Sequence, residues 1–369
     1  MKKTVFGFAV LLIVSLLMNG SSIGVGGAEI LLNSAALKKL TEAPETQVGE
    51  GKLYYIVPTG VPSAGDMWTQ TTASAGWAVR NKPAGLVYNN KMWVIGGSDN
   101  YYNDVWYSTD GITWTEATAS ANWSGRHGHA TLVYDNKMWV IGGTISGSVL
   151  KNDVWYSTDG VTWIQASTSA NWSARSYHSA IVYDNKMWVM GGTSGGSVND
   201  VWYSTDGITW TQATTSANWS PRAYAKPLVY DSKMWLVGGH TLNDVWYTID
   251  GVTWTQATSS ANWSARYWVG AIVYDNKIWV MGGKDGNFRN DVWYSTNGVT
   301  WTEATAGANW AARYEPLVLV YNSKMWVMGG DNGANRNDVW SSDGGVTSPG
   351  GLYFKDENGT VTPIIEVFP

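Results

Sequence analysis

The chain has 369 residues, of which 14% are charged and 14% aromatic, and it contains 42 glycines but no cysteine. A formal net charge of −5 and the lack of any basic run argue against nucleic acid as the main partner. The sequence contains no Walker-type loop, metalloprotease helix motif or cysteine–histidine cluster, so those nucleotide and metal chemistries are not expected.

The first 28 residues have the composition of a secretory signal. Lys2 and Lys3 precede a strongly apolar stretch from Val5 to Met18, and small residues follow up to Ala28. This order predicts a signal peptide over residues 1–28 with cleavage after Ala28. The apolar run is short for a membrane span, and an uncleaved N-terminal anchor is the alternative. We expect a protein that is secreted, periplasmic or at the cell surface, with no membrane span after signal cleavage.

The two segments that flank the main domain contain little regular structure. Residues 29–65 are predicted to be a connector, in which 35–40 fit a short helix and 52–56 a strand. Residues 348–369 are predicted to be a C-terminal tail, with a hairpin over 352–365 around an Asn-Gly turn. Because the first strand of this hairpin shares an apolar pattern with residues 52–56, we expect the two ends of the chain to pair outside the main domain.

Residues 66–347 contain one sequence unit six times. Its most constant part is Lys137-Met-Trp-Val-Ile-Gly-Gly143, and the glycine pairs recur every 44 to 49 residues. A period of this length with several β-rich segments is typical of a propeller or a repeat array. Each unit predicts two hairpins and hence a blade of four antiparallel strands. In one copy the hairpins are 129–134 with 137–141, and 153–157 with 161–165.

The unit resembles the kelch repeat. The Gly-Gly that closes the second strand, the Trp of the fourth strand and the Arg that opens the next unit carry the resemblance. It covers residues 66 to about 347 in six copies. The resemblance implies an all-β fold, a six-bladed kelch-type β-propeller.

The last repeat predicts how the ring closes. It has Gly329-Gly330 and Asp338-Val-Trp340, but no fourth strand follows. An orphan copy of that strand, Met67-Trp-Thr-Gln-Thr71, precedes the first complete unit. We therefore predict that this N-terminal strand completes the sixth blade, because closure removes the sheet edges that an open array would expose.

Four tryptophans in each unit account for 24 of the 25 in the chain. Their regular spacing predicts side chains that pack between blades, not a surface for stacking sugars. The remaining one, Trp268, lies outside the repeat.

The units differ mainly in two places, the loop between strands two and three and the residues after the constant arginine. In a four-stranded meander both emerge on one face, while the invariant Asp-Asn and Asp-Gly turns emerge on the other. Variation on a rigid scaffold favours a binding site on the varied face, although loops can also vary without function. Trp268 and all four histidines lie in these variable stretches.

The histidines raise the question of a metal. His127 and His129 are expected on one side of a strand, with His178 aligned in the next blade, and imidazoles suit zinc or copper. However, kelch units often carry a histidine at this place, so we predict no metal site. The resemblance also includes galactose oxidase, a copper enzyme with a tyrosine–cysteine crosslink. Because this chain has no cysteine, that activity is rejected, and no cofactor is expected.

The six arginines that open the units allow two interpretations. Each has an aspartate at the same end of its blade, as with Arg126 and Asp153, which indicates an ion pair between blades or a clamp on the backbone. The alternative is a ring of arginines that binds carboxylates, as in some kelch proteins that hold acidic peptides, because planar bidentate geometry suits this contact.

A second resemblance concerns carbohydrate enzymes. Ser108-Thr-Asp-Gly-Ile-Thr-Trp114 and its copies are similar to the Asp-box of sialidases, a structural hairpin that implies architecture only. A retaining glycosidase needs paired acids or a Tyr–Glu nucleophile. The candidates for such a set are Tyr314, Glu315, Tyr267, Asp99, Asp285 and Asp331.

We therefore predict an exported, non-catalytic binding module, a monomer that holds a glycan or a protein ligand on its varied face. The alternative is an extracytoplasmic carbohydrate-active enzyme of sialidase-like or sialic-acid-mutarotase-like type; no catalytic residue is assigned. The centre of the site is expected where Tyr267 and Trp268 adjoin Tyr314 and Glu315 at the mouth of the channel. The candidate ligand-binding residues are Tyr267, Trp268, Tyr314, Glu315, Arg266, Arg313, Tyr224, Lys226, Tyr177, His178, His127 and His129.

Overall fold

The computed structural model describes residues 68–342 continuously, together with the short strands at 23–25, 28–30, 46–48, 51–55, 352–355 and 361–363. The chain forms two compact units, one from residues 62–345 and one from 1–61 with 346–369. The predicted signal peptide and the helix expected at 35–40 lie mainly or wholly outside the described residues. Among the described residues, no helix has the length and apolar character needed to span a membrane.

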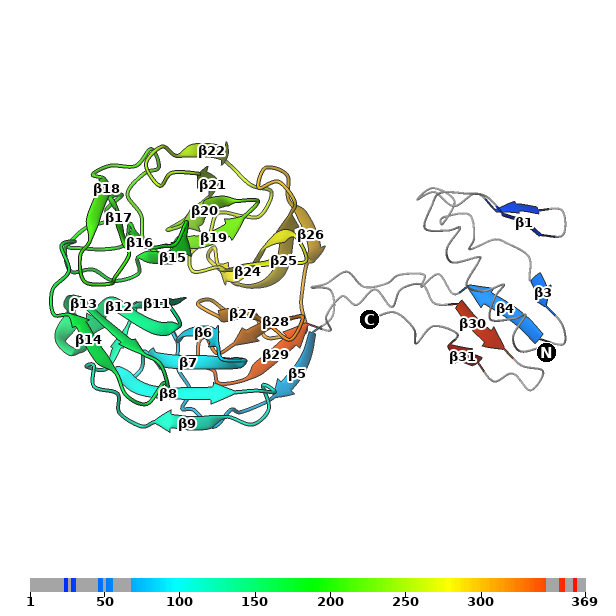
Figure 1. Ribbon diagram of the computed structural model, residues 1–369, viewed down its shortest axis with the longest axis horizontal. Helices are drawn as coiled ribbons and strands as arrows, with labels where there is room; N and C mark the ends of the chain where they lie inside the picture. The colour runs from blue at the N-terminus through cyan, green and yellow to red at the C-terminus, as the bar shows by residue number, and fades with distance from the viewer. Residues whose placement is uncertain are drawn as a thin grey trace. The chain divides into compact units, whose positions relative to one another are not determined.

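The larger unit is a ring of six antiparallel sheets (Figure 1). Blade 1 contains β6 (Ala84–Tyr88), β7 (Lys91–Gly97), β8 (Tyr102–Ser108) and β9 (Thr115–Thr118). Blade 2 contains β11 (Ala130–Tyr134), β12 (Lys137–Ile145), β13 (Val149–Ser157) and β14 (Ile164–Ser167), and β10 (Arg126–His127) also pairs with β12. Blade 3 contains β15 (Ser179–Tyr183), β16 (Lys186–Met190), β17 (Val201–Ser204) and β18 (Thr211–Thr214).

The other three blades repeat this order. Blade 4 contains β19 (Lys226–Tyr230), β20 (Lys233–Gly239), β21 (Leu242–Thr248) and β22 (Thr255–Thr258). Blade 5 contains β23 (Gly270–Tyr274), β24 (Lys277–Lys284), β25 (Phe288–Ser295) and β26 (Thr302–Thr305). Blade 6 contains β27 (Leu317–Tyr321), β28 (Lys324–Met328), β29 (Val339–Ser342) and β5 (Trp68–Thr72). The expected all-β propeller of six four-stranded blades is confirmed.

The turns follow the predicted chemistry with one shift. Asp135 and Asn136 both have positive φ, 48° and 51°, as a type I′ hairpin turn requires. The fourth strand of blade 2 begins at Ile164, three residues later than expected. The reason is that Asp159 accepts backbone hydrogen bonds from Val161 and Thr162 at 2.8 Å, which keeps these residues in the turn.

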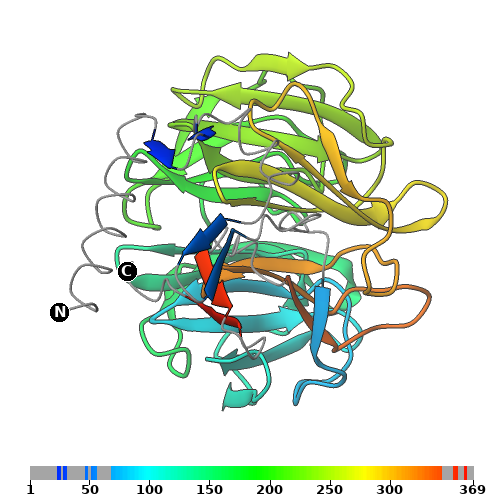
Figure 2. The ribbon, with the colours of Figure 1, turned by 90° about the vertical axis from the view of Figure 1, so that its right-hand side faces the viewer.

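The N-terminal strand closes the ring. β5 pairs with β29, with Gln70 opposite Trp340, and the two strands lie side by side in Figures 1 and 2. Trp68 meets Trp310 edge-on at 6.1 Å, the same contact that Trp163 makes with Trp123 inside the ring. β5 therefore occupies the place of the fourth strand in every other blade.

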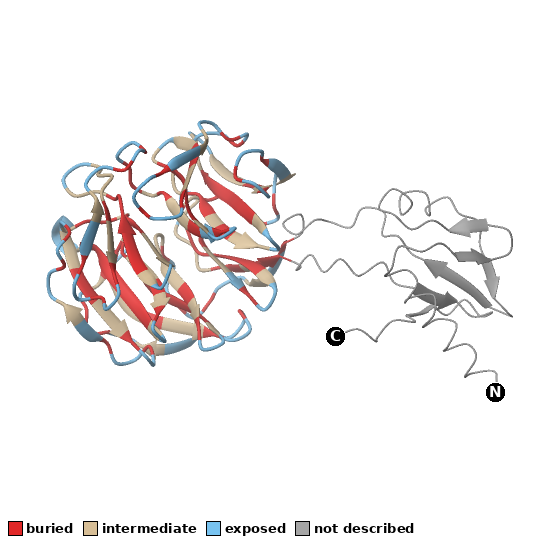
Figure 3. Ribbon diagram, turned by 45° about the horizontal axis from the view of Figure 1, so that its top comes forward, coloured by how far each residue is buried: buried red, intermediate tan, exposed pale blue. Residues whose placement is uncertain are grey.

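The core is divided among the six interfaces between neighbouring blades. One apolar cluster combines Met92 and Trp114 of blade 1 with Leu317, Trp326 and Val339 of blade 6, and five similar clusters fill the other interfaces. Buried residues follow the inner strands, whereas exposed residues concentrate in turns and outer strands (Figure 3). The repeated tryptophans are buried or half-buried in these clusters, as predicted.

Six ion pairs, each with a buried arginine, fix the start of each inner strand. In blade 2, Arg126 donates to the two carboxylate oxygens of Asp153 at 2.7 and 2.9 Å and to the carbonyl of Gly142 at 2.9 Å. Burial raises the pKa of the Asp153 carboxyl, but the hydrogen bonds and charge of Arg126 outweigh burial and hold it below its usual value. The same pair occurs as Arg80–Asp104, Arg175–Asp200, Arg222–Asp244, Arg266–Asp291 and Arg313–Asp338.

The smaller unit pairs the two ends of the chain. It contains β1 (Ile23–Val25) with β2 (Ala28–Ile30), and a sheet in the order β3 (Thr46–Val48), β4 (Gly51–Tyr55), β30 (Leu352–Lys355), β31 (Val361–Pro363). β4 and β30 are antiparallel, with Tyr55 opposite Leu352. The predicted pairing of the ends and the predicted C-terminal hairpin are both present.

Removal of β5 tests the closure of the ring. We expect a chain of residues 73–345 to aggregate, because it exposes the edge of β29 and leaves Trp310 without its edge-on partner. A chain of residues 62–345, which keeps β5, is the matched control and should remain monomeric. Size-exclusion chromatography and thermal unfolding compare the two. Equal stability and a monomeric state for both chains would show that β5 does not close the ring.

Candidate functional site

The varied loops and connections lie on one face of the propeller, as predicted. The residue after each arginine pairs with the start of the loop between strands two and three, for example Ser176 with Thr193 and Tyr267 with Lys284. At the other end of the inner strands, the Tyr88 hydroxyl donates to the carbonyl of Asn136 in the Asp-Asn turn of the next blade at 2.7 Å. The invariant turns therefore lie on the opposite face.

One position on the varied face has a left-handed backbone in all six blades. It lies two residues after the arginine and has φ between 53° and 67°. Glycine adopts this conformation freely, but another residue costs about 1–2 kcal/mol there. Only one of the six is glycine: the residues are Lys82, Gly128, Tyr177, Tyr224, Trp268 and Glu315. Strained residues of such different chemistry at one repeated position mark a candidate functional site.

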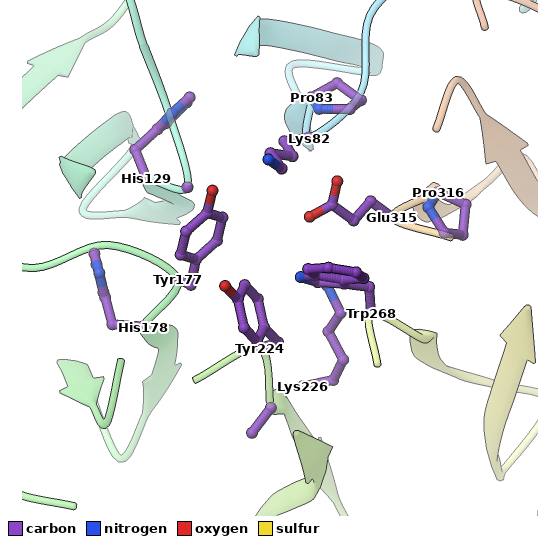
Figure 4. A pocket seen from close by; sticks show the side chains of 12 residues that line it. Lys82, Pro83, His129, Tyr177, His178, Tyr224, Lys226, Trp268, Glu315 and Pro316 are labelled. Atoms are coloured by element: carbon purple, nitrogen blue, oxygen red, sulfur yellow. The ribbon is translucent and has the colours of Figure 1, made fainter. Parts of the chain in front are cut away.

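These six residues surround one pocket (Figure 4). Backbone hydrogen bonds join them across blades: Tyr177 donates to Gly128 at 2.7 Å, Tyr224 to Tyr177 at 2.9 Å and Glu315 to Trp268 at 3.1 Å. The pocket encloses about 560 Å³, including its open mouth, and is also lined by Lys226, His129 and His178. Five side chains of four chemical kinds, from Lys82, Tyr177, Tyr224, Trp268 and Glu315, thus converge around one pocket.

Aromatic rings form a continuous arc around this pocket, the aromatic belt. Trp268 contacts Tyr224 at 5.1 Å and Tyr314 at 4.8 Å between ring centroids. The arc extends through neighbouring contacts of 4.5 to 5.7 Å. In order, its rings are Tyr101, His127, Tyr177, Tyr224, Trp268, Tyr314 and Phe288. Trp268 is half-buried and lines the pocket, so it is not part of the core between blades.

The pocket contains one acid and two amines. Glu315 is buried, and its Oε2 has no hydrogen-bond partner among the described residues. Burial raises the pKa of the Glu315 carboxyl to about 8, although the charges of Lys82 and Lys226 act to lower it. Burial lowers the pKa of the Lys226 amine, while the charge of Glu315 acts in the opposite direction. These groups, together with the buried Nε1 of Trp268, which also has no described partner, can hydrogen-bond a polar ligand.

The three histidines of the sequence analysis do not form one group. Gly128 has φ of 62°, which breaks the extended alternation, so His127 and His129 do not lie side by side as expected. The Tyr177 hydroxyl is 3.0 Å from Nδ1 of His127, in the aromatic belt. His129 is buried against Trp123, and His178 is buried against Trp172 in the next blade. The described residues contain no group of three or more histidines or acids that could hold a metal ion.

The arginines are part of the framework. Arg266 and Arg313 are buried, and their guanidinium groups bind Asp291 and Asp338 and backbone carbonyls. A ligand at the pocket would therefore not contact them, which corrects the hypothesis of an arginine ring that binds carboxylates. The remaining candidates surround the pocket or the adjoining belt: Tyr177, Tyr224, Lys226, Tyr267, Trp268, Tyr314, Glu315, His127, His129 and His178.

Lys82, Tyr101 and Phe288 also contribute to the pocket or the belt but were not predicted from the sequence. Lys82 occupies the repeated left-handed position, so alignment of all six units by their arginine would have found it. Tyr101 and Phe288 lie in or beside the loops between strands two and three. These loops differ in length between blades. The repeat alignment therefore gave no equivalent position that could indicate which aromatic ring would reach the belt.

A six-bladed ring of this repeat, with its varied face around a central pocket, defines a propeller of kelch type. Residues 84–283 match the family model described as the KLHDC2/KLHL20/DRC7 Kelch-repeats domain. This match spans more than half of the chain, and the chain belongs to the kelch-repeat family.

Among solved structures, the chain is similar to one titled "Structure of YjhT". The TM-score is 0.60 at 15% sequence identity, and the similarity covers 79% of this chain and 99% of that chain. At this identity, the likeness shows the fold alone. No curated protein sequence matches the chain.

The left-handed backbone at Trp268 makes two substitutions differ in a measurable way. Trp268→Ala and Trp268→Gly lose the same ring, but only glycine relieves the strain of φ at 55°. We expect the glycine variant to be the more stable by about 1 kcal/mol in chemical unfolding. If the alanine variant is equally stable or more so, residue 268 does not hold a left-handed backbone in solution.

The buried acid predicts a dependence of stability on pH. Because the pKa of Glu315 is raised from 4.5 to about 8 in the folded protein, the folded state keeps a proton that the unfolded state has released. This contribution to stability is complete below pH 4.5 and is lost as the pH rises through about 8. The wild type should therefore lose more stability than Glu315→Gln between about pH 5 and pH 8. An equal loss of stability in both proteins would show that the Glu315 carboxyl is exposed to solvent and that its pKa is not raised.

Proposed function

We propose that this protein is an exported, non-catalytic binding module that holds a glycan or a protein segment on the varied face of its propeller. Kelch propellers are typical interaction modules, and the observation that supports a ligand here is the aromatic belt around the pocket. Partly exposed rings beside unpaired polar groups are common in recognition sites, because one ligand can stack on the rings and hydrogen-bond to the polar groups.

The shape and chemistry of the pocket favour a glycan. Glu315, Lys82 and Lys226 line the same pocket as the rings of Tyr224 and Trp268 (Figure 4). A sugar presents apolar C–H faces for the rings and hydroxyls that both donate and accept. It would therefore satisfy Glu315 Oε2 and Trp268 Nε1, which have no partner in the described part of the chain.

A protein segment is the other candidate ligand. Its support is the length of the belt, which extends from Tyr101 beside His127 to Phe288 beside Tyr314. A monosaccharide would cover only a part of this arc, whereas a peptide or an oligosaccharide can contact several blades. Aromatic residues are also the usual anchors of protein interfaces.

The mature protein can be tested on arrays of glycans and peptides. We expect a ligand whose binding weakens by about 2 kcal/mol or more in Trp268→Ala, because the ring lies at the middle of the belt. Ile112→Ala is the matched control, since Ile112 is 59% exposed in an invariant turn of the opposite face. Unchanged affinity in Trp268→Ala, with a large loss of stability, would assign Trp268 to the framework.

The alternative function is a carbohydrate-active enzyme. One observation favours it: Glu315 is a buried acid with a raised pKa in a pocket, as in many general acids. Its environment contains Lys226 and the Tyr224 hydroxyl but no second carboxylate among the pocket-lining residues described. A screen with hydrolase and mutarotase substrates separates the two functions: turnover that Glu315→Gln abolishes would replace the binding proposal.

A further inference from the structure

Lys226 has no counterpart in the other blades. It is the first residue of its inner strand and pairs with Val237 of β20. The residues at this register in the remaining blades are uncharged, and none carries an amine: Ala84, Ala130, Ser179, Gly270 and Leu317. One side-chain amine is therefore added to the wall of the pocket by a single blade.

The Lys226 amine makes no structural ion pair. Among the described residues, no hydrogen bond or salt bridge connects its Nζ to another side chain. Lysines of the invariant face differ, because each of four binds the aspartate two residues before it within 2.8 Å: Lys137, Lys186, Lys233 and Lys277. The framework thus does not require the charge of Lys226, and its amine is available to a molecule in the pocket.

The surroundings of this amine favour nucleophilic chemistry. Lys226 and Glu315 line the same pocket, and Figure 4 shows the Lys226 side chain directed toward the Trp268 ring and the Glu315 carboxyl directed into the pocket. Burial favours the neutral form of the amine, which is the nucleophilic form. The charged groups around it are Glu315, which acts to keep the amine protonated, and Lys82, which also faces Glu315. With its pKa near 8, Glu315 is mainly protonated at neutral pH and can donate a proton.

We propose that Lys226 binds small hydroxyaldehydes, including reducing sugars in their open-chain form, as a reversible imine. The Nζ lone pair forms a bond to the carbonyl carbon, and the carbonyl oxygen takes a proton from the Glu315 carboxyl. The nitrogen then returns one proton to the Glu315 carboxylate. That proton passes to the hydroxyl group, which leaves as water while the carbon–nitrogen double bond forms. The sum is amine plus aldehyde plus one proton from Glu315 giving a protonated imine plus water, with Glu315 left as the carboxylate and no oxidation or reduction.

This covalent step uses the pocket of the proposed binding function but can fail independently of it. The aromatic walls hold the amine and the acid in one place, and the imine is in equilibrium with free aldehyde, so no turnover is implied. A hydroxyaldehyde suits the site because its hydroxyl can bond to the unpaired Nε1 of Trp268 or to Lys82.

Reductive trapping tests the proposal on the full chain. The folded protein is incubated with glycolaldehyde and sodium cyanoborohydride at neutral pH, and modified lysines are located by peptide mass spectrometry. We expect a hydroxyethyl group on Lys226 before any on Lys137 or Lys186. Glu315→Gln should slow this modification, since the amide supplies no acidic proton. Modification of Lys226 no faster than of the surface lysines would overturn the proposal.

A conservative variant provides the control. Lys226→Arg keeps a long basic side chain but forms no stable imine, so selective labelling should disappear while the near-ultraviolet circular dichroism of the tryptophans is unchanged. The wild-type labelling order decides the matter even if this variant fails to fold. Selective labelling of Lys226 without any ligand on the arrays would support the imine proposal and contradict only the binding proposal. Binding on the arrays without selective labelling of Lys226 would support the binding proposal and contradict only the imine proposal.

Discussion

The buried pair of arginine and aspartate determines where the site can form. Each guanidinium binds the aspartate of the third strand and a glycine carbonyl of the second, so it fixes the chain just before the inner strand. The residue two positions later is then presented to the central pocket whatever its side chain. The same ion pair thus recurs in all six blades, whereas the side chain two residues after each arginine differs between blades. The constant framework and the variable pocket residues are therefore only two residues apart in the sequence.

The propeller could be predicted from the sequence because its determinants are local and repeated. Glycine pairs, Asp-Asn turns and regularly spaced tryptophans specify each blade, and the missing last strand with an orphan copy at residues 67–71 specified the closure. The fourth strand of blade 2 was predicted to begin three residues too early. The side chain of Asp159 accepts hydrogen bonds from two backbone amides and so extends the turn, and the strand pattern in the sequence does not reveal these bonds.

The site was only partly predictable, for physical reasons. Trp268, Tyr314 and Glu315 were brought together as expected, since adjacent blades align equivalent positions. The pairing of each arginine with an aspartate was predicted, and these pairs occupy the donors of Arg266 and Arg313 that a carboxylate-binding ring would need. The histidines separated because the left-handed Gly128 turns successive side chains to different sides. Such backbone reversals are set by contacts between blades, which no single repeat contains.

Closure by β5 has a consequence for how the chain folds. The backbone amide of Trp68 donates to the side chain of Asn309, 241 residues away, and the Thr71 hydroxyl donates to Ser341, 270 residues away. β5 therefore cannot take its final place before the last blade is present. Such distant contacts form slowly. Because all third strands share the Val-Trp pair that β5 covers, β5 is complementary to each of them. The fourth strand of each blade is closer along the chain and therefore closes a shorter loop than β5 would, so the entropy of loop closure favours it at that edge.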